Sequence, residues 1–238
     1  MGKLDGMNAV VAGGTGTVGE GIVRAFLKEG ATVLLPSRSR QAIDALRGYL
    51  AGSPLDRLLP FVGNVADVTD AARLRDEMLR RAGRIDAVVA SLGGTWEEGL
   101  KLVDVPMETW RKYWESNLTP HYVAARTFLP LLANQKGSSY TLLGGLSAVL
   151  TLPNYSVVGV NSAAQLMMAK VLMEEMKDTA VRINQVMFGY VNTRARAAYA
   201  RPEWVTADEV GAFCAYLASR EASMVNAGVI QLGNRPPV

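Results

Sequence analysis

Short apolar runs rich in β-branched residues alternate along the chain with longer segments whose apolar positions recur at helical spacing. The short runs predict strands over residues 8–14, 32–37, 58–65, 85–94, 138–145, 181–189 and 228–233. The longer segments predict helices over 17–30, near 40–50, near 69–82, and over 106–133, 156–176 and 206–219. Because parallel strands joined by helices need right-handed crossovers, we expect the α/β class: one doubly wound parallel sheet of about seven strands, with helices on both faces.

The alternation runs through the whole chain without a repeat, a linker or a low-complexity segment, so we predict a single domain over residues 1–238. Hydrophobic residues make up 49% of the chain and charged residues 20%, which is the composition of an ordinary globular protein. The formal net charge is only +3, and the basic residues are scattered along the chain. The sequence therefore does not indicate nucleic-acid binding.

Cysteine and histidine are scarce. The single cysteine, Cys214, excludes an internal disulfide and agrees with a reducing cytoplasm. One cysteine and one histidine also provide no cluster for a soft metal, so we expect no metal site. The N-terminus lacks the apolar run of a signal peptide, and the most apolar stretch, 141–153, is too short to cross a bilayer. We therefore expect a soluble cytoplasmic protein with no membrane partner.

A glycine-rich turn joins the first predicted strand to the first predicted helix. Gly13, Gly16 and Gly19 are spaced G-x-x-G-x-x-G in "AGGTGTVGEG". Such glycines permit a tight turn and let the backbone approach a pyrophosphate, which then faces the amide groups and the positive dipole end of the helix. We therefore predict that this turn, with Thr15 and Val18, binds a dinucleotide in a Rossmann-type domain; the alternative is a turn that serves only packing.

The second predicted strand ends in "PSRSR". Ser37 and Arg38 stand here, where a site that prefers NAD usually has a carboxylate for the ribose 2′-hydroxyl. A guanidinium at this point would pair with a 2′-phosphate, so the sequence favours NADP over NAD as cofactor. The alternative is a solvated arginine at the start of a helix.

With these motifs placed, the chain resembles the short-chain dehydrogenase/reductase superfamily over nearly its whole length. The resemblance rests on the glycine turn and on the stretches "GNVAD", "GRIDAVVASLGG", "WESNL", "VRINQVMFGYVNT" and "TADEVGAFCAYLASREAS". It implies that the helices over 106–133 and 156–176 assemble a homodimer or homotetramer. It also implies these roles: Asn64 and Val65 beside the adenine, Ala90 and Gly93 along the middle of the cofactor, Val191 and Thr193 at the nicotinamide carboxamide, and Asn117 holding a water chain.

The chain departs from the family where the chemistry is expected. The stretch "ASLG" at 90–93 replaces the usual Asn-Asn-Ala-Gly, and "FG" at 188–189 replaces the usual Pro-Gly. An alignment without gaps places the family's catalytic serine on Gly145, its tyrosine on Val158 and its lysine on Ser162. The usual Ser/Tyr/Lys set is then degenerate.

A narrower resemblance accounts for Tyr155. The enoyl-acyl carrier protein reductases of this superfamily use Tyr-x6-Lys, and "LPNY" and "ASLGG" look like that branch. Seven residues after Tyr155 is again Ser162, the branch's other active-site tyrosine falls on Gly145, and its substrate-covering loop is short here, over 193–206. The resemblance implies Tyr155, Asn117 and Ser162 as catalytic candidates, with Ser162 also able to bond the nicotinamide ribose.

The missing lysine restricts the direction of the reaction. In the family this lysine lowers the pKa of the tyrosine, and without such help a tyrosine of pKa about 10 is only about one part in a thousand phenolate at neutral pH. Oxidation of an alcohol needs a base, whereas reduction needs an acid, and a neutral phenol can donate a proton. We therefore expect an atypical NADP(H)-dependent reductase of a carbonyl or conjugated C=C in a small organic substrate, with Tyr155 as the proton donor.

Other interpretations remain open from the sequence. Tyr155 could instead cap a helix at the rim of the pocket, and Ser147 could point into that pocket. His121 is expected on a helix surface or in a subunit contact rather than as a base. The whole protein could be a catalytically inactive dinucleotide-binding sensor, scaffold or partner subunit, or it could act through protein contacts alone.

Overall fold

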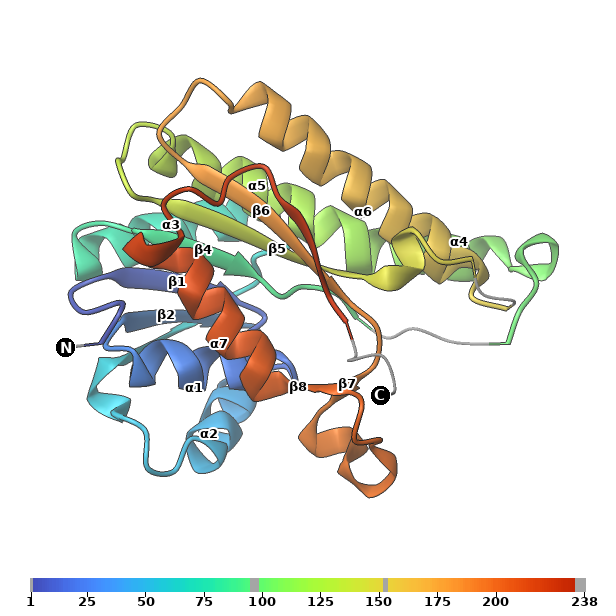
Figure 1. Cartoon of the computed structure of the whole chain (residues 1–238), viewed down its shortest axis with the longest axis horizontal. Coiled ribbons are helices and arrows are strands. Elements are labelled where there is room, and N and C mark those ends of the chain that lie inside the picture. The colour runs from blue at the N-terminus through green and yellow to red at the C-terminus, as the bar shows by residue number, and fades with distance from the viewer. Residues whose placement is uncertain (1, 95–98, 152–153, 234–238) are drawn as a thin grey trace.

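A computed structural model of the chain describes residues 2–94, 99–151 and 154–233. Its centre is a seven-stranded sheet in which every neighbouring pair is parallel. In sheet order the strands are β3 (Leu58–Val62), β2 (Thr32–Ser37), β1 (Asn8–Ala12), β4 (Ala87–Ala90), β5 (Ser139–Gly145), β6 (Arg182–Phe188) and β9 (Val229–Leu232). The predicted doubly wound α/β sheet is confirmed (Figure 1).

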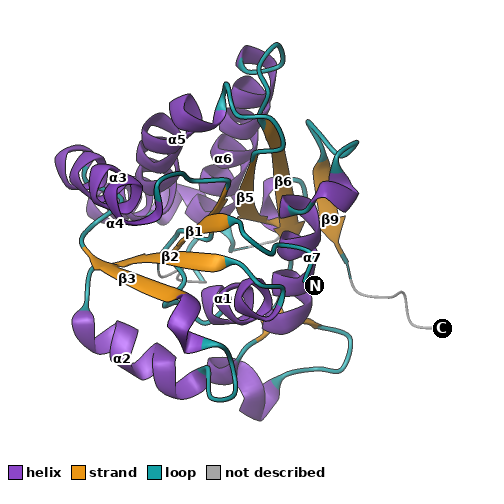
Figure 2. Ribbon diagram, turned by 90° about the vertical axis from the view of Figure 1, so that its left-hand side faces the viewer, coloured by secondary structure: helices purple, strands orange, loops and turns teal. Residues whose placement is uncertain are grey.

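Helices cover both faces of the sheet (Figure 2). On one face lie α1 (Gly19–Lys28), α2 (Arg40–Tyr49) and α7 (Ala207–Ala218), whose buried side chains form one apolar cluster with the sheet. On the other face lie α3 (Val68–Ala82), α5 (Thr119–Leu132) and α6 (Ser156–Glu175), with a second cluster. The inner strands β2, β1, β4, β5 and β6 are almost entirely buried, which explains their continuous apolar runs in the sequence.

The strand order places the functional edge. From β1 the chain first builds β2 and β3 on one side and then crosses to build β4, β5, β6 and β9 on the other. The carboxyl ends of β1 and β4 meet where the order reverses, with Ala12 paired to Ala90. In open α/β sheets, ligands bind in the crevice outside such a reversal.

The predicted helix over 106–133 is interrupted. The structure has α4 (Met107–Tyr113), a π-helical turn (Trp114–Leu118) and then α5. Pro120 lies in the first turn of α5 and has no amide hydrogen to continue a regular ladder, so it suits the start of a new helical segment. Apolar periodicity alone does not reveal one wide turn, because the change spans only a few residues.

The chain also forms a small element that the pattern did not predict. Two short parallel strands, β7 (Val191–Asn192) and β8 (Val205–Thr206), pair outside the main sheet. Between them runs a short 3-10 helix, Arg194–Tyr199. Strands of two residues carry no periodicity, so only the fold could reveal them.

Helix α6 is long and apolar enough, by length and composition, to cross a membrane. The core helices of soluble proteins share that property. Here its inner side chains, including Ala169 and Met173, are buried in the cluster with β5 and β6. Met167 and Val171 are exposed on its outer side.

Candidate functional site

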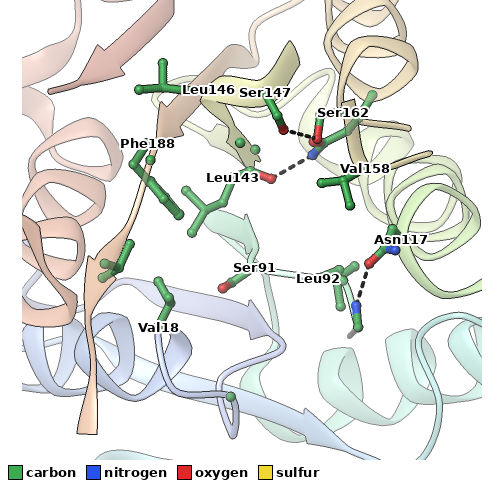
Figure 3. Close-up of a pocket in the computed structure, with 18 of the residues that line it drawn as sticks. Val18, Ser91, Leu92, Asn117, Leu143, Leu146, Ser147, Val158, Ser162 and Phe188 are labelled. Atoms are coloured by element: carbon green, nitrogen blue, oxygen red, sulfur yellow. Dashed lines mark hydrogen bonds between the residues drawn. The ribbon is translucent and has the colours of Figure 1, made fainter. Parts of the chain in front are cut away.

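A cavity of about 720 Å³ opens at the carboxyl ends of the central strands (Figure 3). Its walls come from the turn before α1, the loop after β4, the π-helical turn, the start of α6 and the segment after β6. Figure 3 shows Val18, Ser91 and Phe188 on one side, with Val158 and Ser162 of α6 on the other. The cavity therefore lies at the strand-order reversal.

The glycine turn brings two backbones closer than any side chain allows. Gly13 has a positive φ of 82°, and a Cβ built on it would lie 2.0 Å from the carbonyl oxygen of Ser91. A Cβ on Gly19 would lie 2.1 Å from the carbonyl oxygen of Gly13. The N-cap residue Val18 supplies no side-chain cap to α1. The turn therefore presents bare backbone at a helix N-terminus, which fits the pyrophosphate of a dinucleotide.

The predicted cofactor-binding residues divide into two groups. One group lines the cavity: Gly16, Val18, Gly19, Gly93, Ser162, Val191 and Thr193. The other group lies at or just beyond the carboxyl ends of β1 to β4 without lining it: Gly13, Thr15, Ser37, Arg38, Asn64, Val65 and Ala90. Within the second group, the hydroxyl oxygens of Thr15 and Ser37 are 3.3 Å apart, and the exposed Arg38 follows them.

Asn117 lies in the π-helical turn and lines the cavity. Its Oδ1 accepts a hydrogen bond of 2.6 Å from the amide of Gly94 (Figure 3). The neighbouring Gly93 has a φ of 131°, and a Cβ there would lie 3.2 Å from that same oxygen. Asn117 therefore ties the loop after β4 to the start of α5. Wide helical turns of this kind are frequent at functional sites.

Tyr155 occupies the N-cap position of α6, without a side-chain capping hydrogen bond, and lines the cavity. Its hydroxyl forms a hydrogen bond with the hydroxyl of Tyr190, which follows β6. Tyr155 is half-buried. The phenol therefore faces the same space as the glycine turn.

The three positions that the resemblance assigns to serine, tyrosine and lysine do converge. Gly145, Val158 and Ser162 all line the cavity, although the first comes from β5 and the others from α6. A Cβ on Gly145 would lie 3.5 Å from the hydroxyl oxygen of Ser162. Ser147 points into the cavity and donates a hydrogen bond of 3.0 Å to that oxygen (Figure 3). This wall therefore presents two serine hydroxyls beside an apolar Val158.

The prediction that His121 lies on a helix surface is wrong. Its side chain is 2% exposed and lines the cavity, because the helix starting at Thr119 turns that side of α5 inward. Its Nε2 lies 3.0 Å from the carbonyl oxygen of Leu92. With Nε2 protonated it donates there, and the amide nitrogen of Gln165 lies 3.2 Å from the same Nε2 and 3.4 Å from Nδ1. Burial lowers the pKa of His121 to about 4, so the ring is neutral near pH 7.

Sequence reasoning also missed Gln165, which lies beside His121. Gln165 is buried, lines the cavity and donates a 2.7 Å hydrogen bond to the carbonyl oxygen of Leu143. The available signal was spacing: Gln165 follows Ser162 by three helical positions, and His121 follows Asn117 by four. Each therefore shares a helix face with a predicted site residue.

Aromatic side chains gather around the cavity-lining Tyr190, which the sequence reasoning did not predict. Tyr190 stacks on Trp204, with ring centroids 4.8 Å apart and an interplanar angle of 15°. Tyr199 meets Trp204 edge-on at 6.3 Å. The guanidinium carbon of Arg196 lies 5.9 Å from the centroid of Tyr190. Of the cavity-lining residues that the structure describes, Arg196 is the one with a formal charge.

A family profile and two relatives match nearly the whole chain. A profile of the family described as "Enoyl-(Acyl carrier protein) reductase" matches residues 13–232. The chain is 27% identical over 250 aligned residues to the oxidoreductase asL5 of Sarocladium schorii, with 97% of this chain and 95% of that protein covered. It is 24% identical to the 3-oxoacyl-(acyl-carrier-protein) reductase FabG of Thermotoga maritima, with 96% of each covered.

Solved structures have the same fold. A short-chain dehydrogenase/reductase from Burkholderia xenovorans superposes with a TM-score of 0.85 at 24% identity, over 98% of this chain and 97% of that one. Another from Serratia marcescens superposes with a TM-score of 0.83 at 19% identity, over 97% of each chain. From its sequence profile, its relatives and its fold, the chain belongs to the short-chain dehydrogenase/reductase superfamily of NAD(P)-dependent oxidoreductases.

Proposed function

We propose that this protein reduces a carbonyl or a conjugated C=C of a small organic substrate with NADP(H), and that Tyr155 donates the proton. The observation that carries the proposal is that the phenol of Tyr155 lines the same cavity as the glycine turn. A group that binds the cofactor and a group that can supply a proton therefore face one space. When bound, the reduced dinucleotide supplies a hydride.

The residues that would hold the dinucleotide follow the edge of the sheet. The turn at Gly13, Gly16 and Gly19 would hold the pyrophosphate, because it presents backbone amides without side chains at the N-terminus of α1. Arg38 would pair with a 2′-phosphate, which favours NADP. Val191 and Thr193, beyond β6, would meet the nicotinamide end.

The proton chemistry of the site supports the reductive direction. Ser162 and Ser147 supply hydroxyls but no positive charge next to the reacting position, and Val158 is apolar. His121 is neutral and both its ring nitrogens face partners, so it is a poor base for an alcohol. A neutral phenol can still protonate an oxyanion or enolate as it forms. Tyr155 presents its phenol to the cavity from the N-terminus of α6, and we therefore assign it as the acid.

We also expect a cytoplasmic homodimer or homotetramer. The exposed apolar residues Met167 and Val171 on the outer side of α6 support this expectation, because burying them against a second copy would remove apolar surface from water. Helix α6 is one of the two segments that the family resemblance assigns to assembly.

Turnover of NADPH with a panel of enones, quinones and ketones tests the proposal. Replacing Tyr155→Phe removes the proton donor but keeps the ring, so we expect kcat to fall by about 100-fold or more while NADPH binding stays unchanged. Tyr122→Phe is the matched control, since Tyr122 is exposed on α5 and does not line the cavity.

Three results would contradict the proposal in different ways. If neither dinucleotide binds, the enzymatic assignment fails as a whole. If NADPH binds but no substrate class is reduced, a non-catalytic dinucleotide-binding role replaces it. If Tyr155→Phe turns over as fast as the wild type, the assignment of the acid is wrong.

A further inference from the structure

We propose that Tyr190 is a positioning residue that orients the phenol of Tyr155 and returns a proton to it after each reduction. The inference deepens the proposed function and rests on it. Its starting observation is the hydrogen bond between the hydroxyls of Tyr155 and Tyr190, two cavity-lining residues that are 35 positions apart in the chain.

The fold brings Tyr190 to this position through the small β7–β8 pair. The register pairs Val191 with Val205. The residues immediately before them are Tyr190 and Trp204, so the parallel pairing places these two side by side. Their rings stack at 4.8 Å, and Tyr199 braces Trp204 edge-on. Stacked and edge-to-face aromatic pairs are favourable contacts, so they favour the placement of the Tyr190 ring that brings its hydroxyl to Tyr155.

The residue that contacts the hydroxyl of Tyr155 therefore lies on a different element from the lysine of the family pattern. The lysine slot on α6 carries Ser162, whose hydroxyl oxygen accepts a hydrogen bond from Ser147. Tyr190 supplies the hydroxyl that contacts Tyr155 from the segment after β6. Arg196, the one formal charge among the described lining residues, lies on the same segment, 5.9 Å from the ring of Tyr190.

The proton path balances without any further reagent. The O–H bond of Tyr155 breaks as its proton forms a bond to the oxyanion or enolate of the reduced substrate, which leaves a phenolate. The O–H bond of Tyr190 then breaks and its proton re-forms the phenol of Tyr155. Tyr190 is 39% exposed, so its oxygen can then take a proton from solvent. The tyrosines exchange protons only, and the net consumption is one proton from water.

Replacing Tyr190→Phe tests the relay, because it keeps the stacking ring and removes only the hydroxyl. We expect kcat for NADPH-dependent reduction to fall by about tenfold or more while KM changes by less than about twofold. We also expect the solvent deuterium isotope effect on kcat to change. A hydroxyl with a merely structural role would lower stability without altering this isotope effect.

The double variant Tyr155→Phe/Tyr190→Phe provides the sharper result. If both hydroxyls lie on one path, the double variant is no slower than Tyr155→Phe alone, since the relay has nothing to reprotonate. Tyr216→Phe is the control, because Tyr216 lies on α7 and does not line the cavity. If Tyr190→Phe does not fold, Trp204→Leu is the second test, because it removes the ring that stacks on Tyr190 and keeps both hydroxyls. We then expect a smaller drop in kcat.

Each contrary outcome is distinguishable. An unchanged kcat in Tyr190→Phe, or in a folded Trp204→Leu where the first is unusable, overturns the relay and leaves Tyr155 as the acid. Multiplying losses in the double variant overturn the shared path. A wild-type protein that turns over no substrate overturns both the relay and the proposed function.

Discussion

At the scale of single residues, Arg38 determines the predicted choice of dinucleotide. It is exposed just beyond the end of β2, in a stretch that offers no carboxylate to a ribose 2′-hydroxyl. Hydrogen bonds to charged groups contribute about 1.5–3 kcal/mol each. We therefore expect quenching of protein fluorescence to show tighter binding of NADPH than of NADH. We also expect Arg38→Leu to weaken NADPH binding by about 10-fold or more, with NADH little changed.

Arg47→Leu is the matched control, because Arg47 is also exposed but lies in the last turn of α2. Equal affinity of the wild type for the two dinucleotides would contradict the role of Arg38. So would an Arg38→Leu variant that binds both as the wild type does.

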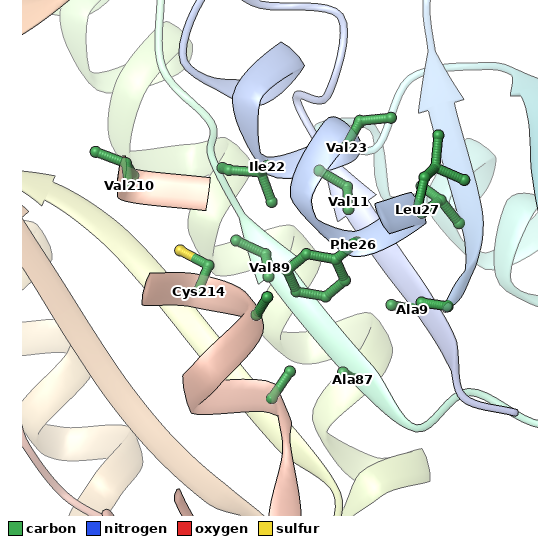
Figure 4. Packing of buried hydrophobic residues seen from close by; sticks show 14 of the residues in the cluster. Ala9, Val11, Ile22, Val23, Phe26, Leu27, Ala87, Val89, Val210 and Cys214 are labelled. Carbon is green, nitrogen blue, oxygen red and sulfur yellow. The ribbon is translucent and has the colours of Figure 1, made fainter. Parts of the chain in front are cut away.

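At the scale of elements, α1 and α7 approach each other through glycine. Figure 4 shows Val210 and Cys214 of α7 near Ile22 and Phe26 of α1, in the apolar cluster that also contains β1 and β4. A Cβ on Gly211 would lie 2.2 Å from the carbonyl oxygen of residue 21, which is backbone and cannot swing away. The close packing of these two helices therefore depends on bare backbone at their crossing.

Gly211→Ala tests this packing. Although alanine favours a helix, the clash with the facing backbone should outweigh that gain and destabilise the protein by about 1–3 kcal/mol. Denaturant unfolding measures the change. Gly48→Ala in α2 is the control, since a Cβ there meets nothing within 4 Å and should stabilise the protein by up to about 1 kcal/mol. A Gly211→Ala variant as stable as the wild type would contradict the contact.

At the scale of the whole molecule, the single histidine should make stability depend on pH. Burial lowers the pKa of His121 to about 4, below its ordinary value of 6.5. Between these values the unfolded chain binds a proton that the folded chain does not, so lowering the pH favours unfolding. This contribution is fully present above about pH 6.5 and is lost as the pH falls toward 4.

Denaturant unfolding at pH 7 and pH 5 measures the effect. One proton per molecule corresponds to about 1.4 kcal/mol per pH unit, so we expect the free energy of unfolding to fall by about 2 kcal/mol. In His121→Gln this loss should largely disappear above pH 5, because no other histidine titrates there. The same loss in wild type and variant would show that His121 is not the cause.

The order of strands and helices was predictable because it depends on local chemistry. Apolar runs, helical spacing and the glycine turn are each written in consecutive residues, and the predicted sheet is confirmed with seven parallel strands. The predicted element boundaries differ from the observed ones where the local sequence pattern gives no signal. The strand predicted over 85–94 ends at Ala90, and the helix predicted over 106–133 contains a π-helical turn. Two-residue strands β7 and β8 have no period to detect.

By itself, then, the sequence determined the fold class and the glycine-rich turn, since apolar periodicity and motif spacing identify these without knowledge of the fold; through the family resemblance it also supplied the candidates Tyr155 and Ser162. Only the tertiary structure decided what surrounds them. His121 and Gln165 meet from α5 and α6, and Tyr190 reaches Tyr155 from beyond β6. Such contacts join residues tens of positions apart, so they depend on how the crossovers pack the elements and leave no signature in any single stretch of chain.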